Sequence, residues 1–84
     1  MLEFITFLVK ELVNNPDDVI IEQKEEAEYT NYLINVYLDD MALIIGKGGK
    51  TIKGVRNLAK AKAIKDQVRI NIELVEHNTP NDQI

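Results

Sequence analysis

The sequence predicts a single α+β domain whose elements follow the order helix, strand, strand, helix, turn, helix, strand. Three features of the chain predict this. With 84 residues, it has room for one modest hydrophobic core and no second domain. Apolar residues recur at three- and four-residue spacing in two segments, as in helices, and alternate with polar residues in two others, as in strands. With 45% apolar and 29% charged residues, the composition is that of an ordinary globular domain.

The first half of the chain predicts one helix and two strands. Apolar spacing predicts an amphipathic helix over residues 2–14, and Pro16 cannot continue it. Residues 18–24 predict a first strand, and the polar residues 25–31 a turn. Residues 32–38 are the clearest strand, because their apolar residues follow an alternating pattern.

The second half predicts two helices around a glycine-rich turn, and then a last strand. Asp39 and Asp40 are expected to cap a short helix over 41–45. A longer helix follows over about 51–64, with a predicted buried face of Ile52, Val55, Leu58, Ala59 and Ala63. Residues 68–74 alternate as a half-buried strand. We expect residues 77–84 to be a flexible tail and assign the domain to residues 1–76.

Positive charge is concentrated in one segment of an acidic chain. The net charge is -4, and residues 1–43 carry ten acidic side chains against two lysines. Residues 44–65 contain no acidic residue and seven basic ones, which are Lys47, Lys50, Lys53, Arg56, Lys60, Lys62 and Lys65. Such a block is typical of a binding site for a polyanion, and the alternative is a solvated lysine-rich helix face.

The composition excludes several classes of function. Without cysteine, and with His77 as its one histidine, the chain has no disulfides, zinc finger or thiol catalysis, and no Ser/His/Asp set can be assembled. No apolar run reaches the ~18 residues of a membrane-spanning helix. The N-terminus lacks the basic region of a secretory signal. We therefore expect a cytoplasmic protein with no catalytic residues, no metal, no cofactor and no membrane partner.

The segment Ile44-Ile45-Gly46-Lys47-Gly48-Gly49-Lys50-Thr51-Ile52 carries the functional prediction. A Walker A loop is excluded because Ile44 stands where its first glycine belongs, and a dinucleotide-binding loop is excluded because Thr51 replaces its third glycine. The remaining interpretation is Ile-Gly-x-x-Gly-x-x-Ile between two helices. This motif resembles the loop with which KH domains clamp about four nucleotides. Its glycines let a sugar–phosphate strand approach the backbone, and the following helix N-terminus and lysines attract phosphate.

Together with Asp39-Asp40-Met41 before it and Val55-Arg56-Asn57-Leu58 after it, this segment resembles the small bacterial single-KH family known as KhpA or YlqC, over roughly residues 1–76. The resemblance implies a type II KH-like domain, in which a three-stranded mixed sheet carries three helices on one face. It also implies binding of single-stranded RNA, with single-stranded DNA left open, and a role as an RNA chaperone. The implied partners are a second copy in a homodimer and a larger KhpB-type KH protein in a heterodimer, with a link to cell-wall synthesis and cell shape.

The predicted RNA-binding residues are the nine of the glycine segment and three cations of the next helix: Ile44, Ile45, Gly46, Lys47, Gly48, Gly49, Lys50, Thr51, Ile52, Lys53, Arg56 and Lys60. The flanking isoleucines are expected to fix the two helices and to line an apolar groove for bases. One departure is that Ala42 and Leu43 stand where the family often has a glycine and a basic residue. It favours an alternative function, a dimerisation module with weak or no RNA binding of its own.

Overall fold

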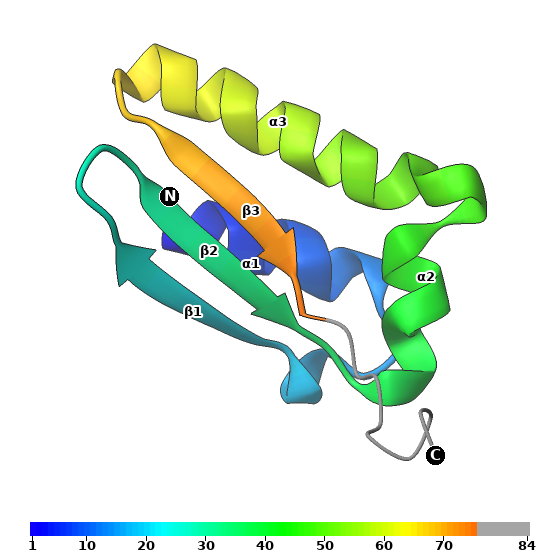
Figure 1. Ribbon diagram of the computed structural model, residues 1–84. Coiled ribbons are helices and arrows are strands. Elements are labelled where there is room, and N and C mark those ends of the chain that lie inside the picture. The colour runs from blue at the N-terminus through cyan, green and yellow to red at the C-terminus, as the bar shows by residue number, and fades with distance from the viewer. Residues whose placement is uncertain (76–84) are drawn as a thin grey trace, which may run out of the picture.

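In the computed structural model, which describes residues 1–75, helices pack on one face of a three-stranded sheet and the predicted order of elements is confirmed (Figure 1). The α-helices and strands are α1 (Leu2–Leu12), β1 (Ile20–Glu25), β2 (Thr30–Asn35), α2 (Met41–Ile45), α3 (Lys50–Asp66) and β3 (Ile70–Leu74). Short 3-10 helices lie at η1 (Pro16–Asp18), η2 (Leu38–Asp40) and η3 (Lys47–Gly49). The predicted tail and His77 lie outside the described residues. Among the helices of residues 1–75, none combines the length and the hydropathy of a membrane span.

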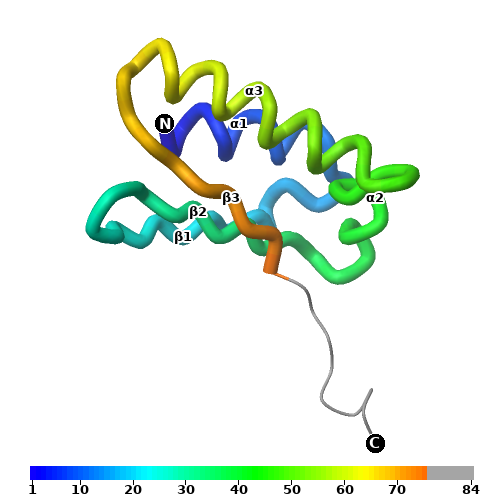
Figure 2. The backbone as a smooth tube through the Cα atoms, turned by 45° about the horizontal axis from the view of Figure 1, so that its top comes forward, coloured from blue at the N-terminus to red at the C-terminus, as the bar shows by residue number. Residues whose placement is uncertain are grey.

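The sheet is mixed and its two faces differ. Its order is β1-β2-β3, with β1 antiparallel and β3 parallel to β2. The return of β3 in the same direction as β2 requires the crossover that α2 and α3 provide. Figure 2 shows α1 and α3 on one side of the sheet. On the other side, Asn71 Nδ2 donates to Asn31 Oδ1 at 2.9 Å and Asn31 Nδ2 donates to Glu73 Oε1 at 3.5 Å, so this face is polar.

The core lies between the sheet and the two longer helices. Its fully buried members include Ile5 and Val9 of α1, Ile34 of β2 and Ala59 of α3. The predicted buried face of α3 is confirmed except at Leu58, whose side chain is 53% exposed. At 100° per residue, Leu58 lies well away from the stripe centred on Ala59, so burial there was wrongly predicted.

All three strands are shorter or shifted relative to the prediction because a strand extends only as far as its partner. The first strand was predicted over residues 18–24 and is observed as β1 over Ile20–Glu25. β2 ends at Asn35, which pairs with Ile20, the first residue of β1. β3 begins at Ile70, opposite Thr30, the first residue of β2. Val68, predicted to lie in the last strand, instead lies in the connection that follows α3, where its amide donates to the Ala63 carbonyl at 2.9 Å.

The turn into α2 differs from the prediction in its chemistry. Asp40 stands at the N-cap position of α2, but its side chain makes no hydrogen bond to the helix amides. It is 1% exposed and accepts hydrogen bonds from Asn15 instead. The carboxylate therefore joins two loops and does not cap the helix.

Candidate nucleic-acid interface

The glycine loop joins α2 to α3 at one end of the molecule (Figure 1). Gly46 ends α2 with φ 78°, and its amide donates to the Ala42 carbonyl at 2.9 Å. A Cβ built at Gly46 would overlap the Thr51 side chain and backbone nitrogen. Glycine is therefore required at this position both for its positive φ and for the close approach of the two helices.

The outer part of the loop is open. Gly48 and Gly49 have φ values of 65° and 77°, and nothing in the described chain lies within 4 Å of a Cβ built at either. Gly49 is the N-cap residue of α3, so no side chain caps the first amides of that helix. Unsatisfied amides at a helix N-terminus attract anions. A phosphate could thus approach the loop backbone and the start of α3 without displacing a side chain.

The residues that flank the loop are mainly structural. Ile44 is fully buried and Ile52 is 7% exposed, and both belong to the core, whereas Ile45 and Thr51 are half-buried. The two buried isoleucines fix the positions of α2 and α3 on either side of the loop. Leu43 is 43% exposed, so the last turn of α2 presents an apolar and not a basic side chain next to the loop.

The structure divides the basic segment between two sides of α3. Lys47, Lys50, Lys53 and Lys60 are exposed. Within residues 1–75, the ion pair found joins Lys62 Nζ and Asp66 Oδ2 at 3.1 Å, so these four lysines have no carboxylate partner there. Lys62 faces α1, where its Nζ lies 5.7 Å from the centre of the Phe4 ring. The exposed cations of the basic segment are thus Lys47 and Lys50 at the loop, Lys53, Arg56 and Lys60 along α3, and Lys65 near the end of that helix.

Arg56 links this side of α3 to the sheet, a contact that sequence reasoning missed. Its Nε donates to the main-chain carbonyl of Ile72 on the edge strand β3, at 3.3 Å. A guanidinium has five N–H donors, so the others remain for a ligand. The helical spacing placed Arg56 beside the buried stripe, but a carbonyl acceptor on another element leaves no signal in the sequence. Of the predicted site residues, the structure thus brings the loop, Lys53, Arg56 and Lys60 onto one side of the domain.

Comparison with known proteins identifies one family. A family model described as "KhpA/KhpB, KH domain" matches residues 2–74. Proteins named "RNA-binding protein KhpA" are 36% identical in Chlamydia trachomatis and 37% identical in Listeria monocytogenes, each over 76 residues. A protein of the same name in Halalkalibacterium halodurans is 29% identical over 76 residues. Each match covers 90% of this chain, and 97%, 100% and 100% of these three relatives.

Proposed function

The chain belongs to the KhpA/KhpB family of KH domains, and from this premise we propose that it binds single-stranded RNA through the Gly46–Gly49 loop. The observation that supports this most directly is the open loop, where exposed Lys47 and Lys50 adjoin the uncapped start of α3. The names of the relatives support RNA as the ligand. The same family membership places the chain among binding domains and not among enzymes.

In the proposed complex, phosphates lie against the loop backbone while the bases extend over the side of α3 that faces β3. KH domains clamp about four nucleotides at such a loop. Lys53, Arg56 and Lys60 continue the positive charge along α3, spaced three and four residues apart so that they share one stripe. Arg56 has a fixed position through its bond to the Ile72 carbonyl. The base-contacting surface is then half-buried Ile45 and the side of α3 that carries Lys53, Arg56 and Lys60.

The test of this proposal is the double variant Lys47→Asp/Gly48→Asp. Both positions face open space, and Asp is among the residues that tolerate the left-handed conformation of Gly48. Two carboxylates would repel phosphate, so RNA affinity should fall about tenfold or more, the effect of losing one charge-assisted hydrogen bond. Fluorescence anisotropy with a labelled single-stranded RNA measures it, and circular dichroism checks the fold.

The matched control is Lys24→Asp/Asn14→Asp, which changes the net charge by the same amount at exposed positions away from the loop. Its RNA affinity should stay close to that of the wild type. Equal losses in the two double variants would show that net charge alone governs binding. Unchanged affinity in the loop variant would contradict the proposed site.

We further propose that the chain forms a homodimer through an apolar groove between α1 and α3. This groove has a volume of about 260 Å³ and is lined mainly by apolar residues, with one acidic and one basic side chain: Leu8, Glu11, Leu12, Lys50, Thr51, Gly54, Val55 and Leu58. The side chains of Leu12 and Leu58 are 39% and 53% exposed, although leucine is a large apolar residue that usually lies in a core. Burying them would stabilise a chain whose single core is small. The groove lies on the α1 side of α3, so a second copy bound there would leave Lys53, Arg56 and Lys60 free for RNA, while it would border the loop at Lys50 and Thr51.

We also propose a heterodimer with a KhpB-type protein, as the resemblance implies, and the matching family model includes KH domains of both KhpA and KhpB. A KhpB-type protein would offer a domain of the same fold to the same groove. We propose that such a pair acts in the cytoplasm as an RNA chaperone, with the effects on cell-wall synthesis and cell shape that the resemblance implies. Two linked RNA sites raise avidity by ~10²–10⁴ without new contacts, which suits a chaperone built from small domains.

The alternative function, dimerisation without RNA binding, is favoured by one observation, the exposed Leu43 where the family often has a basic residue. Sedimentation equilibrium and RNA anisotropy on the same sample separate the two functions. A stable dimer whose RNA affinity is the same in the wild type and in Lys47→Asp/Gly48→Asp would support the alternative.

A further inference from the structure

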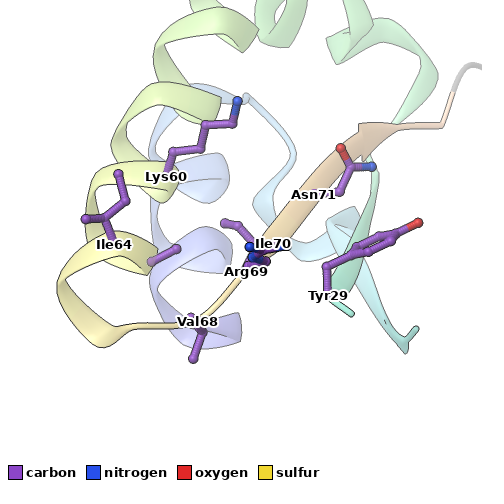
Figure 3. Close-up of a pocket in the computed structure, with 8 residues that line it drawn as sticks. Tyr29, Lys60, Ile64, Val68, Arg69, Ile70 and Asn71 are labelled. Atoms are coloured by element: carbon purple, nitrogen blue, oxygen red, sulfur yellow. The ribbon is translucent and has the colours of Figure 1, made fainter. Parts of the chain in front are cut away.

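A hollow of about 570 Å³ lies at the opposite end of α3 from the glycine loop. Figure 3 shows Lys60 and Ile64 of α3 on one side, Tyr29 of the β1–β2 turn on the other, and Arg69 and Ile70 between them. Its volume falls within the range of small-ligand sites, roughly 300–1,000 Å³. Of its lining residues, only Lys60 has a role in the functions proposed above.

The lining combines uncovered apolar surface with positive charge. Ile64 is 77% exposed, Val68 49% and Tyr29 42%, so the domain itself leaves these side chains uncovered. Lys60 and Arg69 are the charged residues of the lining, and no acidic residue from the described part of the chain joins them. The lining of this hollow is therefore positively charged, although the chain as a whole has a net charge of -4. An unpaired nucleotide fits both properties, because its base has apolar faces that stack on aromatic rings and its phosphate is an anion.

The hollow is continuous with the proposed RNA interface. Lys53, Arg56 and Lys60 lie along one stripe of α3, and Lys60 also lines the hollow. Lys60 follows Lys50 by ten residues, about 15 Å along the helix axis at 1.5 Å per residue. Between them, Arg56 is held against β3 by its hydrogen bond to Ile72. A line of positive charge thus leads from the loop to the hollow.

We propose that the hollow receives a base of the same RNA strand that the loop binds, which extends the interface beyond the roughly four nucleotides of a KH loop. This inference rests on the proposed RNA-binding function. Tyr29 stacks on the base, and Arg69 and Lys60 neutralise the adjoining phosphate. Ile64 and Val68 cover the rest of the base. Longer single strands therefore bind more tightly than short ones, and Tyr29 and Arg69 account for the difference.

The experiment compares single-stranded RNAs of about four and about eight nucleotides by anisotropy. Tyr29→Ala should weaken binding of the longer RNA about fivefold or more, the lower end of the loss of one base–aromatic stack. Arg69→Gln should also weaken binding of the longer RNA and reduce its salt dependence, because it removes a cation that faces phosphate. Their affinity for the shorter RNA should not change. The matched controls are Tyr37→Ala, at a similarly exposed tyrosine, and Lys24→Gln, at an exposed lysine on β1. In both controls, the difference in affinity between the longer and the shorter RNA should equal that of the wild type.

Each outcome bears on either the hollow or the loop. Equal wild-type affinity for both lengths, or equal losses at both lengths in Tyr29→Ala, would overturn the hollow as an RNA site and leave the loop in place. Failure of the wild type to bind either length would overturn both. If Tyr29→Ala binds the longer RNA normally but loses affinity for an acidic peptide, the hollow is a protein-docking site and the inference is wrong.

Discussion

Asp40 and Asn15 join the segment that follows α1 to the start of α2, the helix that leads into the glycine loop. The Asp40 Oδ2 atom accepts a hydrogen bond from the Asn15 backbone nitrogen at 2.9 Å and another from Asn15 Nδ2 at 3.1 Å. Asp40 is 1% exposed and directly precedes α2. A buried carboxylate is tolerated only when it is well hydrogen-bonded. The position of α2, and with it one side of the glycine loop, therefore depends on this contact.

Replacing Asp40 by Ala should destabilise the domain. The change removes two hydrogen bonds to a charged acceptor and leaves the half-buried Asn15 without its partner, so the free energy of unfolding should fall by about 2–4 kcal/mol. Urea unfolding followed by circular dichroism measures it. Asn15→Ala keeps the hydrogen bond from the Asn15 backbone nitrogen, so its loss in the free energy of unfolding should be less than half of that in Asp40→Ala. A loss below about 0.5 kcal/mol in Asp40→Ala, the size of an ordinary surface substitution, would contradict the role given to this pair.

RNA binding should weaken steeply with salt. A loop that holds about four nucleotides neutralises two to four phosphates, so log affinity should fall against log salt with a slope of roughly -1.5 to -3. The slope should be shallower in Lys47→Asp/Gly48→Asp, because counterion release at the loop is lost. Anisotropy titrations over a series of salt concentrations give both slopes. An affinity that does not change with salt would contradict the electrostatic interface.

The sequence predicted local features well and missed those that depend on distant partners. Alternation and helical spacing placed the α-helices and strands of residues 1–75 in order, and the glycine loop lies between α2 and α3 as predicted. The strand ends were less accurate, since Asn35 and Ile70 are set by pairing with other strands. The Arg56–Ile72 bond and the Asp40–Asn15 pair join residues 16 and 25 positions apart, and no local pattern reports such contacts. Leu58 was misplaced because its leucine side chain suits a core, whereas the helix turns it outward.

Stability should fall at high pH partly through Tyr32. Burial, and secondarily the charge of Glu25, raise the pKa of the Tyr32 hydroxyl above 10.0. The folded state therefore keeps this proton where the unfolded state loses it, and the stabilisation decreases as the pH rises above 10.0. In a pH titration followed by near-ultraviolet absorbance, Tyr32 should be the last tyrosine to ionise. Tyr32→Phe should therefore remove the part of the tyrosinate signal that appears at the highest pH. If the variant and the wild type titrate alike after normalisation to tyrosine content, Tyr32 is not protected by burial.

Gly54 separates monomer stability from dimer formation. It lies in the interior of α3, where glycine costs about 1 kcal/mol relative to alanine. A Cβ built there has no neighbour within 4 Å among residues 1–75, so Gly54→Ala should stabilise the monomer by up to about 1 kcal/mol in urea unfolding.

The same Cβ would project into the α1–α3 groove, which we propose as the dimer contact. Sedimentation equilibrium should therefore show weaker dimerisation in Gly54→Ala and weaker still in Leu58→Glu, which places a charge on the exposed leucine of that groove. The control Ala61→Glu changes an exposed α3 residue that does not line the groove, and it should leave the dimer intact. If Gly54→Ala and Leu58→Glu dimerise as the wild type does, the two chains meet through another surface.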